Sequence, residues 1–170
     1  DMPLFDTYYQ EDFDSVRSVC GFTAHAREII DLVKKLGLRP VLATNPFFPA
    51  IATQKRVRWA GLEPEDFAYI TTYENSSFCK PNPLYYREIL DRLGLRAEEC
   101  VMVGNDALED VAAAKLGLPV FLLTHSRETP ELSLKTPMQY RYYQALSAAT
   151  KVGNGTVFRH PCGRGRLKIL

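Results

Sequence analysis

The sequence predicts an α/β fold, a Rossmann-like three-layer arrangement in which a parallel sheet lies between helices. Short apolar runs with the character of buried parallel strands occur at residues 41–43, 101–103 and 120–123. Helical patterns separate these runs, and glycine or proline stands at most of their boundaries. Strands alternating with helices favour right-handed crossovers, which place the strands in one parallel sheet with helices on both faces.

In the first half of the chain, residues 1–22 are aromatic and acidic, and the spacing of Leu4, Tyr8 and Phe13 predicts an amphipathic helix. Thr23 is a candidate cap for the next helix, which Gly37 ends. The further predicted elements are a helix at 24–36, a strand at 41–43, a helix from 49 or 50 to 59, a turn at 64–66 and a strand at 69–72.

In the second half, two prolines make the loop at 79–83 rigid, and Pro83 suits the first position of a helix. An apolar stripe through Tyr86, Ile89, Leu90 and Leu93 continues that helix. The remaining predicted elements are a strand at 101–103, a helix from Asp106 to a glycine cap at Gly117, and a strand at 120–123.

Composition indicates a chain with a real core, because 46% of its 170 residues are hydrophobic, and no apolar run is long enough to cross a membrane. The four cysteines have no metal-type spacing, so we expect reduced thiols in the cytoplasm. Residues 126–170 are basic and lack periodicity, which predicts an irregular, disordered tail. This tail lacks the alternation of aromatic and basic residues expected of a nucleic-acid binder.

Polar residues follow three of the predicted strands. Thr44 and Asn45 follow the first, Lys80 lies in the loop after the next, and Asn105, Asp106 and Asp110 follow a third. Ligands of parallel sheets bind at the carboxyl ends of the strands. Carboxylate and amide oxygens there suit Mg²⁺, and a hydroxyl and an ammonium beside them suit a phosphate.

Structural alternatives exist for each of these residues. Asp106 is also a plausible helix N-cap and Asp110 a solvated charge in the first helical turn. Thr44 is also a plausible strand-end cap, and Lys80 an ordinary loop lysine. Each alternative is reasonable for one residue taken alone, so the interpretation depends on all of them meeting at one edge of the sheet.

These motifs together resemble the haloacid dehalogenase-like (HAD) superfamily of phosphohydrolases, over residues 26–124. VLATN is similar to the second family motif, CKPNP to the third and VGNDALED to the fourth. The sequences of these motifs also resemble those of a bacterial subgroup of the superfamily. The resemblance implies an incomplete HAD-type α/β core at residues 23–125, the end of a helical cap or a linker at residues 1–22, and a separate tail at 126–170.

The same resemblance implies an Mg²⁺-dependent phosphatase that acts on a small phosphorylated metabolite through an aspartyl-phosphate. Thr44 and Lys80 then carry catalytic roles and, with Asn45, contact the phosphoryl group. Asp106, Asp110 and Asn105 hold or orient the metal. Neither a membrane nor a nucleic acid is an expected partner, and the oligomeric state is left open.

Two departures from the family pattern leave alternatives open. The glycine of the fourth motif is followed by Asn105 and only then by Asp106, so either residue is a candidate metal contact. The nucleophile motif is matched only by Asp12-Phe13-Asp14-Ser15-Val16, which no apolar strand precedes. We expect the nucleophile strand to lie upstream of residue 1 and this polypeptide to be inert. The alternative is a catalytically inactive HAD-like binding domain.

Overall fold

The computed structural model describes residues 2–122 and 168–169, and it divides into two compact units, Asp1–Ser77 and Phe78–Leu170. Each unit is described by itself. The predicted domain boundaries at residues 22 and 125 stay predictions. Most of the predicted tail lies outside the described residues, but its Lys168–Ile169 forms a short strand, β3.

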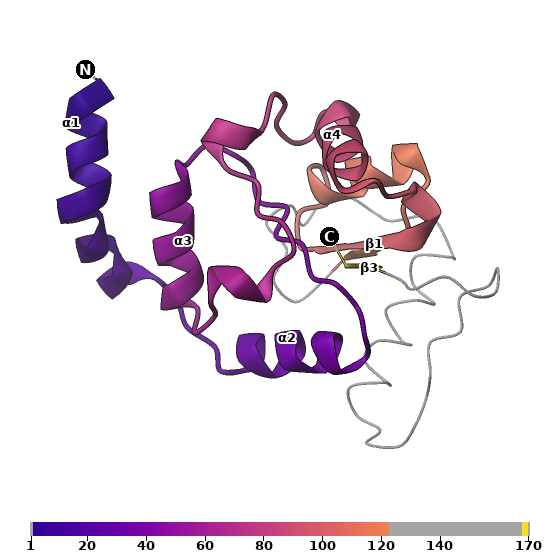
Figure 1. Ribbon diagram of the computed structural model, residues 1–170, viewed down its shortest axis with the longest axis horizontal. Helices are drawn as coiled ribbons and strands as arrows, with labels where there is room; N and C mark the ends of the chain where they lie inside the picture. Colours follow the sequence, from indigo (N-terminus) through magenta and orange to yellow (C-terminus); the bar gives the residue numbers. More distant parts are fainter. Residues whose placement is uncertain (1, 123–167, 170) are drawn as a thin grey trace. The chain divides into compact units, whose positions relative to one another are not determined.

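Helices dominate the first unit (Figure 1). As predicted, residues 2–19 are helical, although they form successive turns of different pitch instead of one α-helix. The elements are α1 (Met2–Thr7), η1 (Tyr8–Asp12), η2 (Phe13–Val19), α2 (His25–Lys35), α3 (Ala50–Trp59), η3 (Pro64–Asp66) and η4 (Tyr73–Asn75).

An aromatic cluster joins the N-terminal turns to α3. Phe13 is buried and stacks on Trp59 with 5.1 Å between ring centroids, and Tyr9 packs edge-on against Phe13. Lys55 of α3 donates from Nζ to Asp14 Oδ2 at 2.9 Å, and this ammonium lowers the pKa of Asp14. Of the three residues whose spacing predicts an apolar face, Phe13 is buried against α3, whereas Leu4 and Tyr8 are exposed.

Among the described residues, the predicted strands at 41–43 and 69–72 form no regular strand and pair through a parallel bridge between Leu42 and Ile70. The backbone N–H of Leu42 donates to Tyr69 O at 2.9 Å, and that of Thr71 donates to Leu42 O at 3.1 Å. Val41 and other residues of these segments are buried as expected of strands. The prediction of regular strands is wrong because the pairing is too short to form a ladder.

Asp66 fastens η3 to α2. Arg27 Nη1 donates to Asp66 Oδ2 at 2.5 Å, Lys34 Nζ donates to Oδ1, and the backbone N–H of Glu63 donates to Oδ2 at 2.8 Å. The hydrogen bond from Arg27, with those from Lys34 and Glu63, holds the pKa of the Asp66 carboxyl far below its usual range, although burial opposes the shift.

Replacing Asp66 by asparagine is expected to remove part of the pH dependence of stability. Because folding depresses the pKa, the stabilisation is fully present above the unfolded value of about 3.9 and is lost as pH falls toward the folded value. Arg27 and Lys34 are partly exposed, so we expect a loss of about 1–2 kcal/mol at pH 7 and a smaller one at pH 3.

Urea unfolding followed by the fluorescence of Trp59, the single tryptophan, measures this effect. Asp31→Asn is the matched control, because Asp31 contacts the same Arg27 but lies exposed on α2. If the free energy of unfolding of Asp66→Asn changes between pH 3 and pH 7 by the same amount as that of the unaltered chain, the prediction is contradicted.

The second unit contains the parallel sheet, and the predicted α/β class is confirmed. The strands are β1 (Cys100–Gly104), β2 (Val120–Leu122) and β3, in the order β2-β1-β3. Met102 pairs with Val120 and Cys100 with Lys168, both in parallel. Cys100, Val101 and Met102 of β1 are almost wholly buried, as predicted for a central strand.

Helical segments cover this sheet. α4 (Pro83–Leu93) packs against η6 (Asp110–Leu116), and η6 contacts β1 and β2 (Figure 1). A further turn, η5 (Ala97–Glu99), leads into β1. Gly117 ends η6 with a φ of 91°, a left-handed conformation that side chains rarely adopt, so the predicted glycine cap is confirmed.

The predicted helix start at Asp106 is wrong by one turn, since η6 begins at Asp110 and has 3₁₀ geometry. Asp106 Oδ1 accepts the backbone N–H groups of Leu108 at 2.7 Å and Glu109 at 2.8 Å. A carboxylate that satisfies these amides stabilises a separate turn before the helix. Asp106 therefore caps this turn, whereas the N-cap residue of η6 is Glu109.

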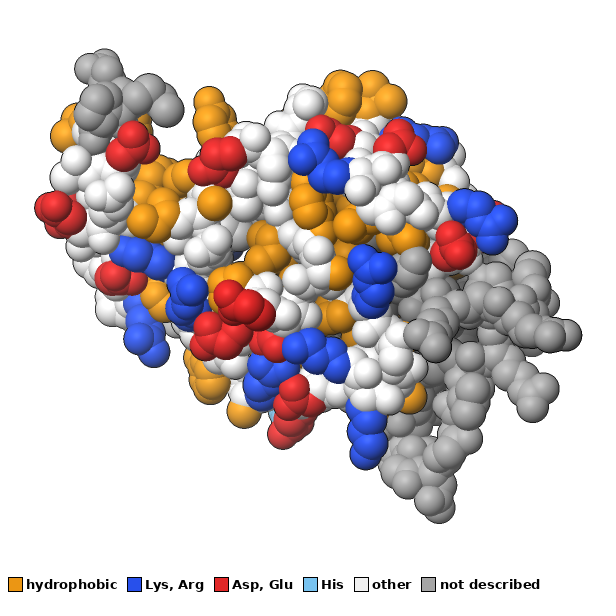
Figure 2. Space-filling view, viewed as in Figure 1, with side chains coloured by type: hydrophobic (Ala, Val, Ile, Leu, Met, Phe, Trp, Pro, Cys, Tyr) orange, Lys and Arg blue, Asp and Glu red, His pale blue; other side chains and the backbone are white. Residues whose placement is uncertain are grey.

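Charges of both signs lie interspersed on the face shown in Figure 2. Several form surface ion pairs, such as Arg58 with Glu63 at 3.4 Å and Arg92 with Glu88 at 3.2 Å. Among residues 2–122 and 168–169, no helix has the length and apolar character that crossing a membrane requires.

Candidate functional site

The side chain of Asp110 is the centre of a buried polar cluster at the end of β1. Its Oδ2 accepts the backbone N–H groups of Asn105 and Asp106, each at 3.0 Å. Its Oδ1 accepts from Lys80 Nζ at 2.6 Å. Both oxygens are engaged and the residue is only 4% exposed. The alternative of a solvated first-turn charge is therefore wrong for Asp110.

Lys80 reaches this cluster from the loop before α4, and its side chain is 7% exposed. Its ammonium also lies over the ring of Tyr85, at 6.0 Å from the centroid. A buried ammonium is unfavourable without a partner, and Asp110 supplies the opposite charge. Lys80 is thus a buried, paired lysine and not an ordinary loop lysine.

Gly104 makes room for the Asp110 carboxylate. A Cβ added to Gly104 would lie 1.9 Å from Asp110 Oδ2 and 2.3 Å from its Cγ, far inside van der Waals contact. Any side chain at this position would expel the carboxylate. The absence of a side chain at residue 104 is what allows Asp110 to turn back beneath the amides of Asn105 and Asp106.

Tyr86 of α4 holds the turn from the other side. Its hydroxyl donates to the backbone carbonyl of Glu109 at 2.8 Å, and the residue is fully buried. Burial, with the charge of Asp110 nearby, raises the pKa of Tyr86 well above its usual value. The phenol therefore stays a neutral hydrogen-bond donor at any ordinary pH.

Thr44 and Asn45 lie in the first unit, after the extended segment at Leu42. The Thr44 carbonyl accepts from the Thr71 hydroxyl at 2.7 Å, and the Asn45 carbonyl accepts from the Phe47 amide at 2.9 Å. Both are half-buried. The structure brings together Lys80, Asn105, Asp106 and Asp110, whereas the approach of Thr44 and Asn45 to them stays a prediction.

The donor set beside β1 suits a magnesium ion that takes few ligands from protein. Asp106 offers a carboxylate and Asn105 an amide oxygen, both half-buried at the strand end. Asp110 is already occupied by Lys80 and two amides. Among the described residues there is no group of three or more His, Cys, Asp or Glu side chains able to hold a metal. Mg²⁺ commonly uses one or two carboxylates, waters and substrate phosphate.

The candidate nucleophile motif at residues 12–16 does not follow a strand. Asp12 ends η1, and the next four residues lie in the 3₁₀ turn η2. Phe13 is in the aromatic cluster, and the carboxylate of Asp14 is bonded to Lys55. This location differs from the strand end expected of the nucleophile motif, and the cap at residues 1–22 stays a prediction.

Sequence reasoning missed two residues of this cluster. Tyr86 belongs to the apolar stripe of α4, where a tyrosine is indistinguishable from a packing residue. Gly104 stands at the end of a predicted strand, where a glycine is expected simply to let the backbone turn. The signal for Gly104 in the sequence is its position directly before Asn105 and Asp106 and six residues before Asp110. The clash that excludes a side chain at residue 104 is seen only in the structure.

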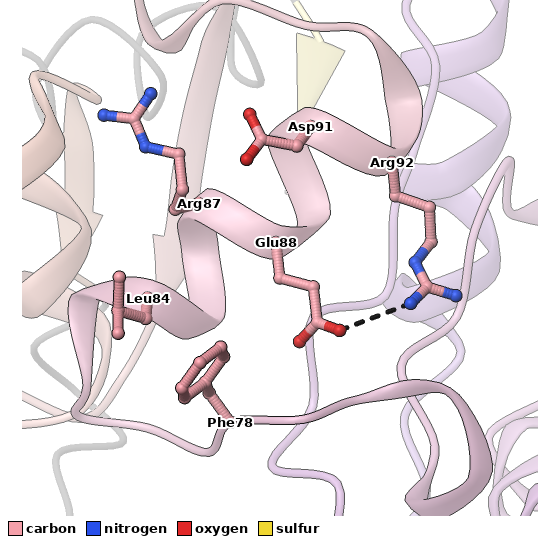
Figure 3. A pocket seen from close by; sticks show the side chains of 6 residues that line it. All are labelled: Phe78, Leu84, Arg87, Glu88, Asp91 and Arg92. Carbon is pink, nitrogen blue, oxygen red and sulfur yellow. Dashed lines mark hydrogen bonds and ion pairs between the residues drawn. The ribbon is translucent and has the colours of Figure 1, made fainter.

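A shallow groove of about 480 Å³ lies elsewhere, along the outer side of α4 (Figure 3). Phe78 and Leu84 form one end, and Glu88 and Arg92 are joined by an ion pair of 3.2 Å. It is also lined by Arg87 and Asp91. None of the predicted site residues lines it, so concavity alone does not locate the chemistry in this chain.

The chain is similar to known hydrolase sequences. A family profile described as haloacid dehalogenase-like hydrolase matches residues 9–132. The chain is also 28% identical over 144 residues to haloacid dehalogenase-like hydrolase domain-containing protein 3 of Xenopus laevis. That match covers 76% of this chain but only 57% of the relative, so the chain spans little more than half of its length.

Solved structures show the same fold. A HAD phosphatase from Thermococcus onnurineus is 20% identical, with a TM-score of 0.53 over 69% of this chain and 54% of that one. A protein described as a predicted phosphoglycolate phosphatase from Haemophilus somnus is 18% identical, with a TM-score of 0.58 over 85% of this chain and 63% of that one. At these identities, the likeness is one of fold.

Proposed function

The chain belongs to the haloacid dehalogenase-like hydrolase family, and we propose that it forms part of an Mg²⁺-dependent phosphatase for a small phosphorylated metabolite. The observation that supports the proposal most is the buried pair of Lys80 and Asp110 at the end of β1. Structural neighbours described as phosphatases agree with it. The cytoplasmic location stays a prediction.

In the proposed mechanism, Lys80 neutralises negative charge on the transferring phosphoryl group, and Asp110 fixes the position of that ammonium. Asp106 would hold Mg²⁺, with Asn105 as a second contact and Asp110 orienting both through their amides. The bound ion would neutralise phosphate charge and so ease the approach of an anionic nucleophile. The Thr44 hydroxyl and Asn45 would donate to phosphoryl oxygens.

The attacking carboxylate is proposed to come from neither Asp12 nor Asp14, because both lie in helical turns. In the family reaction, an aspartate oxygen bonds to phosphorus as the ester oxygen leaves and takes a proton from a second acid. Water then hydrolyses the aspartyl-phosphate. Residues 1–170 alone are therefore expected to bind phosphate without turning over an ester.

Replacing Lys80 by alanine is expected to weaken phosphate binding at least about tenfold, since one charge-assisted hydrogen bond is lost. Inorganic phosphate is titrated in the presence of Mg²⁺ while the amide signals of residues 105 and 106 are followed by NMR. Lys55→Ala, which removes a lysine paired on the surface of the other unit, is the control.

Hydrolysis of p-nitrophenyl phosphate with Mg²⁺ is measured in parallel. Turnover that Lys80→Ala abolishes would place the nucleophile within residues 1–170, and Asp12→Asn would then test its location. Phosphate binding and turnover that are both indifferent to Lys80 would overturn the proposal.

A catalytically inactive binding domain is the second candidate. It is favoured by the helical position of Asp12. It differs in one measurable way, because an inactive domain has no need of a metal. Phosphate binding that is unchanged by removing Mg²⁺ would support this candidate over the first.

A further inference from the structure

Tyr86 is the residue through which α4 reaches the turn that carries Asp106 and Asp110. Its hydroxyl donates to the Glu109 carbonyl at 2.8 Å, and Glu109 directly precedes Asp110. The adjacent Tyr85 is equally buried, and the two rings meet edge-on with centroids 5.0 Å apart. Since both rings are enclosed, Tyr86 has little freedom to move its hydroxyl away from Glu109.

The turn contains two kinds of contact that depend on its shape. Asp106 Oδ1 caps the amides of Leu108 and Glu109, which leaves the Glu109 carbonyl pointing toward α4. Asp110 then turns back to accept the amides of Asn105 and Asp106. A shift of the Glu109 peptide would therefore displace the residues on both sides of it.

Lys80 provides a further contact with the turn. It lies in the loop before α4, and its Nζ donates to Asp110 Oδ1 at 2.6 Å. The turn is thus contacted by the hydroxyl of Tyr86 in α4 and by Lys80 in the loop before that helix. The geometry points to Tyr86 as a positioning residue of the site: its hydroxyl sets the Glu109 peptide, and so the orientation of the Asp106 carboxylate toward a divalent cation and of the Asp110 carboxylate toward Lys80 and the two amides.

This inference rests on the proposed function only in naming Mg²⁺ as the cation. Tyr86 does not touch metal or substrate in this account, and its effect passes through the Glu109 carbonyl. Residues that orient metal ligands from behind commonly change metal affinity by 10- to 100-fold when altered. Its high pKa keeps the hydroxyl protonated, so the contact is insensitive to pH over the neutral range.

Tyr86→Phe tests the inference, because it removes the hydroxyl and keeps the ring. Amide hydrogen exchange of the 170-residue chain is expected to accelerate about tenfold or more at Asn105 and Asp106. Exchange at Met102, whose amide donates to Pro119 O at 2.9 Å in the sheet, should change less than about twofold. Binding of Mg²⁺ alone, followed by the Asp106 amide signal, should weaken about 10- to 100-fold.

Tyr85→Phe is the matched control, since it removes a hydroxyl from the neighbouring buried tyrosine without touching the Glu109 contact. It should leave exchange at Asn105 and Mg²⁺ affinity within about twofold of the unaltered chain, well below the tenfold expected from a lost hydrogen bond. Unchanged exchange in Tyr86→Phe would overturn the inference, as would equal acceleration at Met102 or an equal effect of Tyr85→Phe. If the unaltered chain fails to bind Mg²⁺, the proposed function fails, while the exchange results still decide the role of Tyr86.

Discussion

Replacing Gly104 by alanine is expected to dismantle the Asp110 cluster and to destabilise the second unit by about 1–3 kcal/mol. The new methyl carbon would lie 1.9 Å from Asp110 Oδ2, and the neighbouring atoms of Asp110 are also within 2.8 Å. A flexible side-chain tip could swing away, but this carboxylate is held by two amides and an ammonium. Relief therefore requires breaking those contacts or moving β1.

Thermal and urea unfolding followed by circular dichroism measure the loss of stability, and NMR signals of the Asn105 and Asp106 amides report the loss of the cluster. Gly21→Ala is the matched control, because a Cβ at Gly21 meets no atom within 4 Å and its φ is not in the left-handed region. A Gly104→Ala chain with native stability and unshifted amide signals would show that Asp110 is not packed against Gly104 as described.

Removing Asp110 is expected to be the most destabilising single change in the site, at about 3–5 kcal/mol for Asp110→Ala. The reason is that the buried ammonium of Lys80 loses the carboxylate to which it bonds, and two backbone amides lose their acceptor. Lys80→Met should have a smaller effect, because Asp110 keeps the two amides. In the double variant the buried ammonium is absent, so its stability should lie above that of Asp110→Ala.

A double-mutant cycle on Lys80 and Asp110 measures this coupling by urea unfolding. Lys55 and Asp14 provide the comparison, since their ion pair has a similar length, 2.9 Å, but Asp14 is 59% exposed. That pair should show little coupling, because solvent and salt screen exposed charges. Strict additivity at Lys80 and Asp110 would contradict the view that the two form a buried unit.

The helices α3 and α4 and the strands β1 and β2 follow from periodicity and from glycine or proline at their ends. The segments at residues 41–43 and 69–72 carry the composition of strands but form a single bridge, because composition reports burial and not the length of the pairing. The helix start at Asp106 was displaced because an acid before an apolar run caps a helix and a preceding turn equally well.

The site was predictable in its residue types and only partly in its contacts. Placing Lys80 with the acids after β1 came from the order of strand ends, and the structure brings Lys80 and Asp110 together. The sequence cannot distinguish an acid that binds a metal ion from one that pairs with a lysine side chain. Asp110 pairs with Lys80. The roles of Gly104 and Tyr86 depend on a missing atom and on a backbone carbonyl, neither of which a pattern reveals.

We propose that Lys80 and the turn at residues 105–110 serve one bound phosphate and its metal ion, and the sequence predicts that Thr44 and Asn45 contact the same phosphate. Paramagnetic broadening by Mn²⁺, added in place of Mg²⁺ with inorganic phosphate, tests it most directly. Signals of Asn105 and Asp106 should broaden first, followed by those of Lys80 and of Thr44 and Asn45. Broadening confined to exposed acids such as those of α2, or absent from Thr44 when Asp106 is broadened, would contradict the account.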